Sequence, residues 1–301
     1  MPLGLIFKLL IMMFLQYMVW GLWLTTIPQH MGDQGLNFSP VQIAIVFCSY
    51  GFGSIIGPFI IGQLADRYFA TEKVLASCHF LGGLLLIGSA YATSFVSLFA
   101  LLFIYCNLYM PTMGLTNSIT FRSLGDENQW VFPWVRSLGT IGWIAGGWLI
   151  AAYLESKDLA FMKPLFDIPA IGAPTFGDCL RIAGVLSIIY SLFCLCLPHT
   201  PPVPAKPTDP IDKKSATLES LELMRNRSFA VLVVVAGVIG IMLAFYFGCE
   251  SFFLQDLGVK PERISFYMSF GQIAELAIMG VLPLVVSQLG VKTTMILGAS
   301  A

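Results

Sequence analysis

The stretch FPWVRSLGTIGWIAGGWLIAAYL, Phe132 to Leu154, is long and apolar enough to cross a lipid bilayer as one helix. A charged side chain, Arg136, nevertheless lies within its first two turns. A cation in a spanning helix costs at least about 2.5 kcal/mol, so it normally faces the interior of a helix bundle or a water-filled cavity. The segment therefore predicts a membrane protein and marks one position where function is to be sought.

The whole chain has the composition of an integral membrane protein. Hydrophobic residues make up 57% of its 301 residues and charged residues only 11%, whereas soluble domains are about a quarter charged. The formal net charge of −1 and the lack of a basic block argue against a nucleic-acid partner. The seven cysteines show no CxxC or Cys/His spacing, so we expect neither a metal site nor a cofactor.

Eight segments of about 20 mostly apolar residues predict spanning helices. They are 6–30, 41–64, 73–92, 95–121, 131–154, 180–198, 228–255 and 263–288. A ninth apolar run begins at Val291 and reaches Ala301, which is too short to cross, so we expect a fragment of a longer chain. The predicted fold class is an all-α membrane protein.

The polar, proline-rich stretch 199–227 divides the predicted helices into two groups. Residues 1–198 would form a complete six-helix transmembrane bundle, 199–227 a cytoplasmic linker loop, and 228–301 an incomplete second bundle of two helices and the start of a third. Two bundles related by an axis along the membrane normal can rock about a site at their interface. This organisation favours a transporter.

Basic residues predict the orientation, because cytoplasmic loops are enriched in lysine and arginine. Five fall on one side of the predicted spans: Lys157, Lys163, Arg181, Lys260 and Arg263. Ten fall on the other side: Lys8, Arg67, Lys73, Arg122, Lys206, Lys213, Lys214, Arg225, Arg227 and Lys292. We therefore expect a multi-pass protein whose N-terminus lies in the cytoplasm.

Arg136, Thr140 and Trp143 recur at i, i+4 and i+7 and so share one helix face. A guanidinium donates hydrogen bonds in a fixed fork, and tryptophan can stack on a ring. The stripe therefore favours a binding site for a flat, polar ligand. Two alternatives stay open: Arg136 could extend to the membrane surface, and the glycines within 139–147 could make the segment a packing face.

A second polar pair, Gln272 and Glu275, lies in the segment SFGQIAELAIM and shares one helix face. Glu275 falls near the middle of its predicted span, where an ionised carboxylate is costly. It is therefore a candidate for ligand hydrogen bonding, for proton coupling, or for both. The alternative is a buried salt bridge, for example to Arg136.

Three further residues are candidates for lining a cavity: Gln16, Trp20 and Phe247. Gln16 and Trp20 share a face with Trp23, at i, i+4 and i+7 in FLQYMVWGLWLTTIP. Gln16 either reaches the cavity or bonds a neighbouring helix, and both alternatives stay open. His79 is expected to be packed and hydrogen-bonded rather than to relay protons.

The loop GQLADRYFATEKV, Gly62 to Val74, resembles the cytoplasmic signature of the major facilitator superfamily. In that superfamily an aspartate and nearby basic residues form a charge latch between the two bundles. The matching residues here are Asp66, Arg67 and Lys73. The alternative is an ordinary turn at the membrane edge with flanking charges.

Longer blocks resemble the bacterial nucleoside permeases, the nucleoside:proton symporter family of that superfamily. The blocks cover essentially the whole chain and include FLQYMVWGLWLTTIPQHM, YMPTMGLTNSITF, FPWVRSLGTIGWI, FGQIAEL and LPLVVSQLGVKTTMILG. The resemblance implies twelve helices in two six-helix bundles, the second of which would be cut off here in its ninth helix. It also implies nucleoside uptake across the bacterial inner membrane by alternating access, driven by the proton gradient without a cofactor.

The resemblance assigns the nucleoside site to residues already singled out, namely Arg136, Thr140, Trp143, Gln272 and Glu275. The expected partners are a nucleoside, protons and the lipid bilayer, and we expect a monomer. The well-known permease has amide side chains on its seventh helix where this chain reads AFYFGCE, so the site here would be more aromatic. An acidic residue that the family carries on its tenth helix would lie beyond Ala301.

Two other functions stay open from the sequence. The same fold could carry another small polar solute, such as a sugar or a nucleobase, or the chain could be a receptor or a truncated relic that does not transport. An enzyme is not expected, because the sequence shows no H-E-x-x-H or G-x-S-x-G motif and no Ser/His/Asp arrangement at one depth.

Overall fold

The computed structural model describes residues 2–156, 175–202 and 225–300, and every regular element in these ranges is helical. The first part of the chain forms α1 (Leu3–Gly21), α2 (Ile27–Met31), α3 (Pro40–Gly57), α4 (Gln63–Arg67), α5 (Thr71–Ser89), α6 (Phe95–Leu124), α7 (Phe132–Glu155) and α9 (Asp178–Cys194). Short turns, η1 (Pro58–Gly62) and η2 (Asp126–Val131), lead into α4 and α7. After residue 225 come α11 (Arg227–Asp256), η3 (Pro261–Arg263) and α12 (Ile264–Ser300).

Six helical stretches of the described residues are long and apolar enough to cross a membrane: Leu3–Gly21, Pro40–Arg67, Phe95–Leu124, Asp126–Glu155, Arg227–Asp256 and Pro261–Leu282. The spans predicted at 73–92 and 180–198 correspond to α5 and α9, which form helices but lie outside this set. The helix α9 is only 17 residues long. The prediction of an all-α membrane protein is confirmed.

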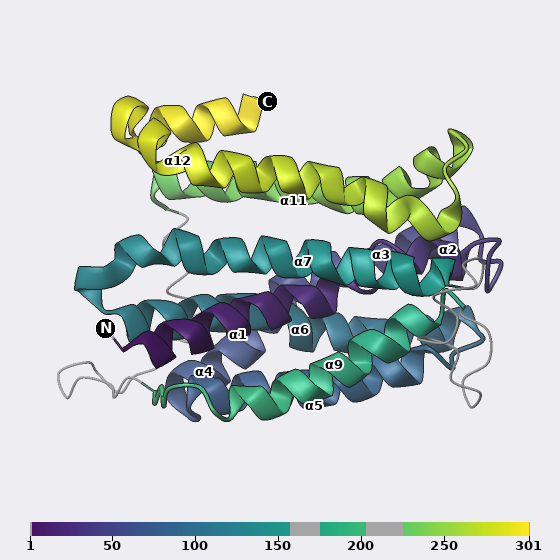
Figure 1. The fold of residues 1–301 in the computed structure, drawn as a ribbon, viewed down its shortest axis with the longest axis horizontal. Helices are drawn as coiled ribbons and strands as arrows, with labels where there is room; N and C mark the ends of the chain where they lie inside the picture. The colour runs from purple at the N-terminus through teal and green to yellow at the C-terminus, as the bar shows by residue number, and fades with distance from the viewer. Residues whose placement is uncertain (1, 157–174, 203–224, 301) are drawn as a thin grey trace.

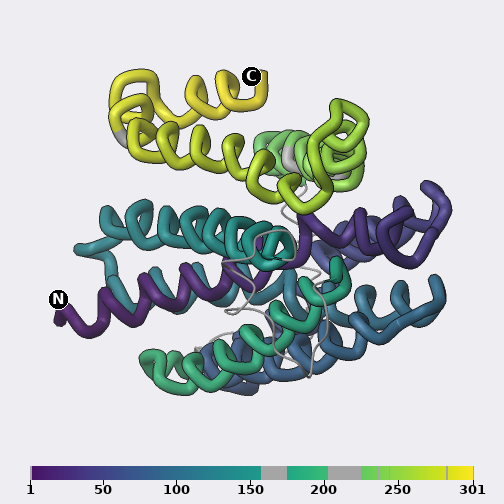
Figure 2. Tube along the Cα trace, turned by 45° about the vertical axis from the view of Figure 1, so that its right-hand side comes forward, coloured from purple at the N-terminus to yellow at the C-terminus, as the bar shows by residue number. Residues whose placement is uncertain are grey.

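The elements form one bundle with an added layer. Figure 1 shows α1, α5, α6, α7 and α9 running in the same general direction, with α11 and α12 lying on the α7 side of the bundle. Figure 2 shows the same separation from another angle. We call the end where α1 begins the N-terminal face, and the end where α1 finishes the opposite face.

Glycine sets the spacing of the three helix pairs with the most extensive contacts, which are α1 with α7, α5 with α9, and α3 with α6. A Cβ on Gly142 of α7 would overlap the Phe14 carbonyl of α1. A Cβ on Gly83 of α5 would lie 2.7 Å from the Gly184 carbonyl oxygen of α9. Backbones that approach this closely are typical of membrane helices, where small residues allow tight packing. The alternative left open from the sequence, that glycines within 139–147 form a packing face, holds for Gly142 and Gly146 on the side of α7 that meets α1.

A buried chain of polar side chains crosses the bundle. The Gln16 amide nitrogen donates to the Thr112 hydroxyl at 2.7 Å, and the Gln16 amide oxygen lies 2.8 Å from His79 Nε2. The other ring nitrogen, Nδ1, lies 3.0 Å from the Ser187 hydroxyl. The chain joins α1, α5, α6 and α9. His79 is therefore packed and hydrogen-bonded, as expected.

The segment after α9 is held to the N-terminal face. Glu72, at the start of α5, accepts hydrogen bonds from His199 Nδ1 at 2.8 Å and from the Thr200 backbone N–H at 3.0 Å. Arg122 of α6 donates to the Pro201 carbonyl at 2.9 Å. Lys8 of α1 donates to the Cys196 carbonyl at 2.8 Å. These contacts return the chain to the face where α1 begins.

Most of the predicted linker 199–227 lies outside the described residues, and so do five basic residues used to predict the orientation: Lys157, Lys163, Lys206, Lys213 and Lys214. The domain boundaries and the orientation therefore stay predictions. Near the other end of the chain, Gly290 breaks α12 with a left-handed backbone (φ 74°, ψ 161°). Glycine adopts this conformation readily, and the break falls between the span predicted to end at 288 and the run predicted to begin at Val291.

Gly142→Ala is expected to lower the thermal stability of the full gene product in detergent. The added methyl group meets main-chain atoms of Phe14, which cannot rotate away, and overpacking of this kind costs about 1–3 kcal/mol. The control is Gly114→Ala on α6, where a Cβ meets nothing within 4 Å. Equal melting temperatures for the two variants would contradict the packing described for α1 and α7.

Glu72→Gln is expected to destabilise the protein near pH 7 and to reduce its sensitivity to acid. Burial raises the pKa of Glu72, but the hydrogen bonds from His199 and Thr200 outweigh burial, so the pKa lies below the usual 4.5. A lowered pKa adds stability above about pH 4.5 that is lost as the pH falls through the folded-state value. Melting temperatures measured across this range check the prediction, with the exposed Glu127→Gln as control. Parallel pH profiles for wild type and Glu72→Gln would refute it.

Candidate functional site

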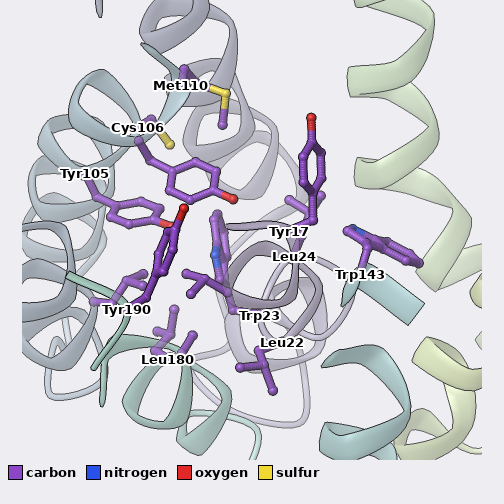
Figure 3. Packing of buried hydrophobic residues seen from close by; sticks show 14 of the residues in the cluster. Tyr17, Leu22, Trp23, Leu24, Tyr105, Cys106, Met110, Trp143, Leu180 and Tyr190 are labelled. Atoms are coloured by element: carbon purple, nitrogen blue, oxygen red, sulfur yellow. The ribbon is translucent and has the colours of Figure 1, made fainter. Parts of the chain in front are cut away.

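The close contact of α1 and α7 brings one face of each helix beside the C-terminal helices. Gly21 of α1 lies against the Trp143 backbone, and Gly146 of α7 lies against the Met18 carbonyl. Figure 3 shows Tyr17 and Trp143 at the edge of the buried cluster, next to the pale green helices of the C-terminal part. This edge carries the residues of the predicted stripe on α7.

Arg136 is half-buried and points across to α1. Its guanidinium carbon lies 4.1 Å from the centroid of the Tyr17 ring. Its Nη1 atom is buried and has no hydrogen-bond partner among the described residues. A cation–π contact contributes about 0.5–2 kcal/mol, whereas an unsatisfied buried donor costs about 1–3 kcal/mol and more when it is charged. One donor of Arg136 is thus left without a hydrogen bond in this conformation.

The other residues of the stripe are buried beside it. Thr140 and Trp143 are each 4% exposed. Phe247 of α11 lies 6.2 Å from Trp143 and 6.1 Å from Trp20, measured between ring centroids. Trp20 in turn stacks on Tyr50 of α3 at 5.8 Å. The predicted aromatic residues are therefore brought together, and Phe247 joins the first bundle to α11.

Gln272 and Glu275 lie on α12 at about the depth of the stripe. The Trp148 indole donates to the Ser269 hydroxyl at 2.8 Å, which fixes the level of α12 against α7. Because a helix rises about 1.5 Å per residue, Glu275 lies about 9 Å beyond Ser269 along α12, and Thr140 about 12 Å beyond Trp148 along α7.

Glu275 is exposed on α12. No ion pair between Arg136 and Glu275 forms in the described structure. The salt bridge weighed from the sequence is therefore not made in this conformation.

The C-terminal helices contact the first bundle at the opposite face. The Thr25 and Ser265 hydroxyl oxygens are 2.7 Å apart and buried. An ion pair joins Arg263 of η3 to Glu155 at the end of α7. With the Trp148 hydrogen bond, these contacts close the interface between the bundle and α12 at that end.

Toward the N-terminal face the same helices separate. Every described side chain of α11 from Val231 to Leu243 is exposed, and most of α12 beyond Phe270 is exposed as well. Figure 1 shows α12 near α7 at the opposite face and farther from it toward the N-terminal face. The predicted site therefore lies along the part of this interface that opens toward the N-terminal face, with Trp143 nearer the closed end and Arg136 nearer the N-terminal face.

The predicted latch residues lie at this open end. Asp66, Arg67 and Lys73 are all exposed. None of them makes an ion pair with another of the three. Their role as a latch between two bundles stays a prediction.

One expected cavity residue lies elsewhere. Gln16 is fully buried, and its amide nitrogen and oxygen are hydrogen-bonded to Thr112 and His79. It therefore bonds neighbouring helices rather than lining a cavity in this conformation. The reason is helical geometry: Gln16 and Tyr17 differ by about 100° around α1, and it is Tyr17 that turns toward α7. Sequence reasoning missed Tyr17, although its i, i+3 spacing from Trp20 could have indicated it.

A large cavity of about 970 Å³ lies away from these residues, between α3 and α11. Its walls are mostly apolar, with Phe47, Phe52 and Phe245 among them, and Asp33 and Asp256 are its only charged lining residues. None of the predicted site residues lines it. Polar ligands need convergent polar groups, so we place the candidate site at the α1–α7–α12 interface. No group of metal-ligating side chains occurs among the described residues.

The long apolar helices define a multi-pass membrane protein. A profile of the family described as nucleoside H+ symporter matches residues 3–301. The chain is 33% identical over 292 residues to YegT, a candidate nucleoside transporter of Escherichia coli (strain K12), which covers 97% of this chain and 64% of YegT. It is 28% identical over 305 residues to the nucleoside permease NupG of the same organism, covering 98% of this chain and 68% of NupG.

The crystal structure of the nucleoside transporter NupG superposes on this fold with a TM-score of 0.73 at 28% identity, covering 96% of this chain and 69% of that one. The chain belongs to the nucleoside H+ symporter family, and the expected major facilitator fold is confirmed. It spans about two thirds of the length of these relatives.

Thr25→Cys together with Ser265→Cys is expected to form a disulfide on mild oxidation. Hydroxyl oxygens 2.7 Å apart place the two Cβ atoms within reach of each other. The experiment uses a background without the exposed cysteines Cys48, Cys196 and Cys249 and counts, after denaturation without reductant, the thiols that maleimide no longer labels. Thr25→Cys with Ser287→Cys, at the far end of α12, is the control pair. Equal cross-linking of both pairs, or of neither, would contradict the closed interface.

Proposed function

We propose that this chain forms the first bundle and part of the second bundle of a proton-coupled nucleoside transporter that works by alternating access. The nucleoside would bind between α1 and α7 on one side and α12 on the other. Membership of the nucleoside H+ symporter family supports the substrate class and the coupling ion. A transport family is also the reason to assign no enzymatic activity.

One observation carries the proposal: the Arg136 guanidinium is held in a bundle interface with a buried Nη1 that has no hydrogen-bond partner. Burying such a donor is unfavourable unless something completes it. Glu275, on α12, forms no ion pair with it among the described residues. A ligand with hydroxyl or carbonyl oxygens would supply the missing acceptor.

The chemistry of a nucleoside suits the side chains present. Its flat base can stack on Trp143, and its base edge and sugar hydroxyls can bond to Arg136, Thr140 and Gln272. Trp20 and Phe247 would complete the aromatic wall. We assign proton coupling to Glu275. A carboxylate at mid-membrane depth beside the substrate can bind a proton when the site is open to one side of the membrane and release it when the site opens to the other.

The contacts at the opposite face suit alternating access. Closure there, with separation toward the N-terminal face, corresponds to one of the two states that a rocking carrier needs. Passage to the other state would break the Thr25–Ser265 contact and the Glu155–Arg263 ion pair. Asp66, Arg67 and Lys73 would then latch the two bundles on the N-terminal side.

We further propose the bacterial inner membrane as the location, with the N-terminal face in the cytoplasm. The clustering of basic residues on that side supports this orientation. The carrier would act as a monomer, without a cofactor, metal or nucleic acid, and the proton gradient would drive uptake.

Arg136→Gln is expected to reduce nucleoside uptake by about tenfold to a hundredfold, because hydrogen bonds from a charged donor contribute about 1.5–3 kcal/mol. Uptake of labelled uridine and adenosine is measured with the full gene product in cells that lack their own nucleoside carriers. The exposed Arg225→Gln removes a charge elsewhere and serves as the control. Normal transport by Arg136→Gln would refute the site.

Two further arms of this experiment test the function itself. An uncoupler that collapses the proton gradient is expected to abolish accumulation. Unlabelled sugars are expected to leave nucleoside uptake unchanged, whereas competition by sugars would favour a carrier of another polar solute. Failure of the wild-type protein to take up any nucleoside would overturn the proposed function.

A further inference from the structure

The contact between Arg136 and Tyr17 uses only part of the guanidinium. The Arg136 guanidinium carbon lies over the Tyr17 ring, 4.1 Å from the ring centroid. The five N–H donors of arginine point outward in the guanidinium plane. One ring contact therefore steadies the cation but cannot engage all five of its donors. A carboxylate partner would instead take these donors in a bidentate pair.

The surroundings are shaped for this contact. A Cβ on Gly139 would lie 2.7 Å from Tyr17 Cδ2 and 2.9 Å from Arg136 Nη1, so any side chain at this position would push the pair apart. The Tyr17 ring is 7% exposed, and α1 is fixed at the preceding residue, where the Tyr109 hydroxyl donates to the Gln16 carbonyl at 2.6 Å. Tyr17 is thus a rigid surface rather than a mobile neighbour.

Glu275 is the competing partner for the cation. Arg136 and Glu275 form no ion pair with each other among the described residues. A direct ion pair would neutralise both groups. The ligand would then lose a donor, and the carboxylate would lose its freedom to take a proton.

We propose that Tyr17 is a positioning residue of the nucleoside site: its ring holds the Arg136 guanidinium at the α1–α7 interface, so that donors of the arginine that the ring does not engage can bond to substrate oxygens. This inference rests on the proposed function. It assigns a specific task to a residue that would otherwise count as part of the aromatic packing between α1 and α7.

A double-mutant cycle separates positioning from packing. Uridine uptake kinetics are measured for the full gene product as wild type, Tyr17→Leu, Arg136→Gln and the double variant, each normalised to its amount in the membrane. Tyr17→Leu is expected to raise KM about two- to thirty-fold, the range of a lost cation–π contact, with little change in maximal rate. In the Arg136→Gln background the same change is expected to alter KM less than about twofold.

Tyr17→Phe keeps the ring and is the conservative variant, expected to restore KM to within about twofold of wild type. Gly139→Ala disturbs the same contact from α7 and is expected to raise KM. It replaces Tyr17→Leu if that variant does not reach the membrane. An equal rise in KM from Tyr17→Leu in both backgrounds, or an unchanged KM for Gly139→Ala, would overturn the proposal.

Binding of uridine to purified protein, measured by calorimetry, separates this inference from the transport hypothesis. A wild-type protein that binds uridine without transporting it would overturn the transport proposal. The double-mutant cycle would then be measured as Kd for uridine, with the same ratios between variants expected as for KM. A wild-type protein that neither binds nor transports any nucleoside would overturn both proposals.

Discussion

The arrangement depends on how closely α1 and α7 approach each other. Lipid gives two apolar helices little reason to associate, so packing of small residues must hold them together. Gly21, Gly142 and Gly146 allow the two backbones to touch. That approach fixes the relative rotation of the helices, and with it the position of Arg136 over Tyr17. A cation that would be costly in lipid is thereby placed against a ring at a protein interface.

The interface with α12 has a different character at its two ends. At the opposite face it is held by a buried hydroxyl pair and an indole hydrogen bond. An exposed ion pair adds at most about 1 kcal/mol to the free energy of unfolding. The Glu155–Arg263 pair therefore contributes little to stability and mainly sets how η3 and α12 align along α7. These few contacts are weak enough to break and re-form, as a carrier requires. The polar chain through Gln16 and His79 lies within the first bundle and would move with it as a unit.

The helices and the α7 stripe could be predicted from the sequence alone, because the helices follow from hydropathy and the stripe from the 3.6-residue period. Arg136, Thr140 and Trp143 share a face wherever the helix lies. The rotation of α1 could not be predicted in the same way, since Gln16 and Tyr17 are adjacent and each has a reason to face inward. Packing on α7 selects Tyr17 for the site and leaves Gln16 to bond Thr112. The contacts between Thr25 and Ser265, 240 residues apart, depend on how the helices assemble and carry no local signal.

The most direct test of the central claim is a structure of the full gene product with a bound nucleoside. The measured quantity is the distance from the ligand's oxygen and nitrogen atoms to the Arg136 guanidinium and the Gln272 amide. The account predicts hydrogen-bond distances to both, with the base beside Trp143. A nucleoside lodged in the apolar cavity between α3 and α11, out of reach of Arg136, would contradict it.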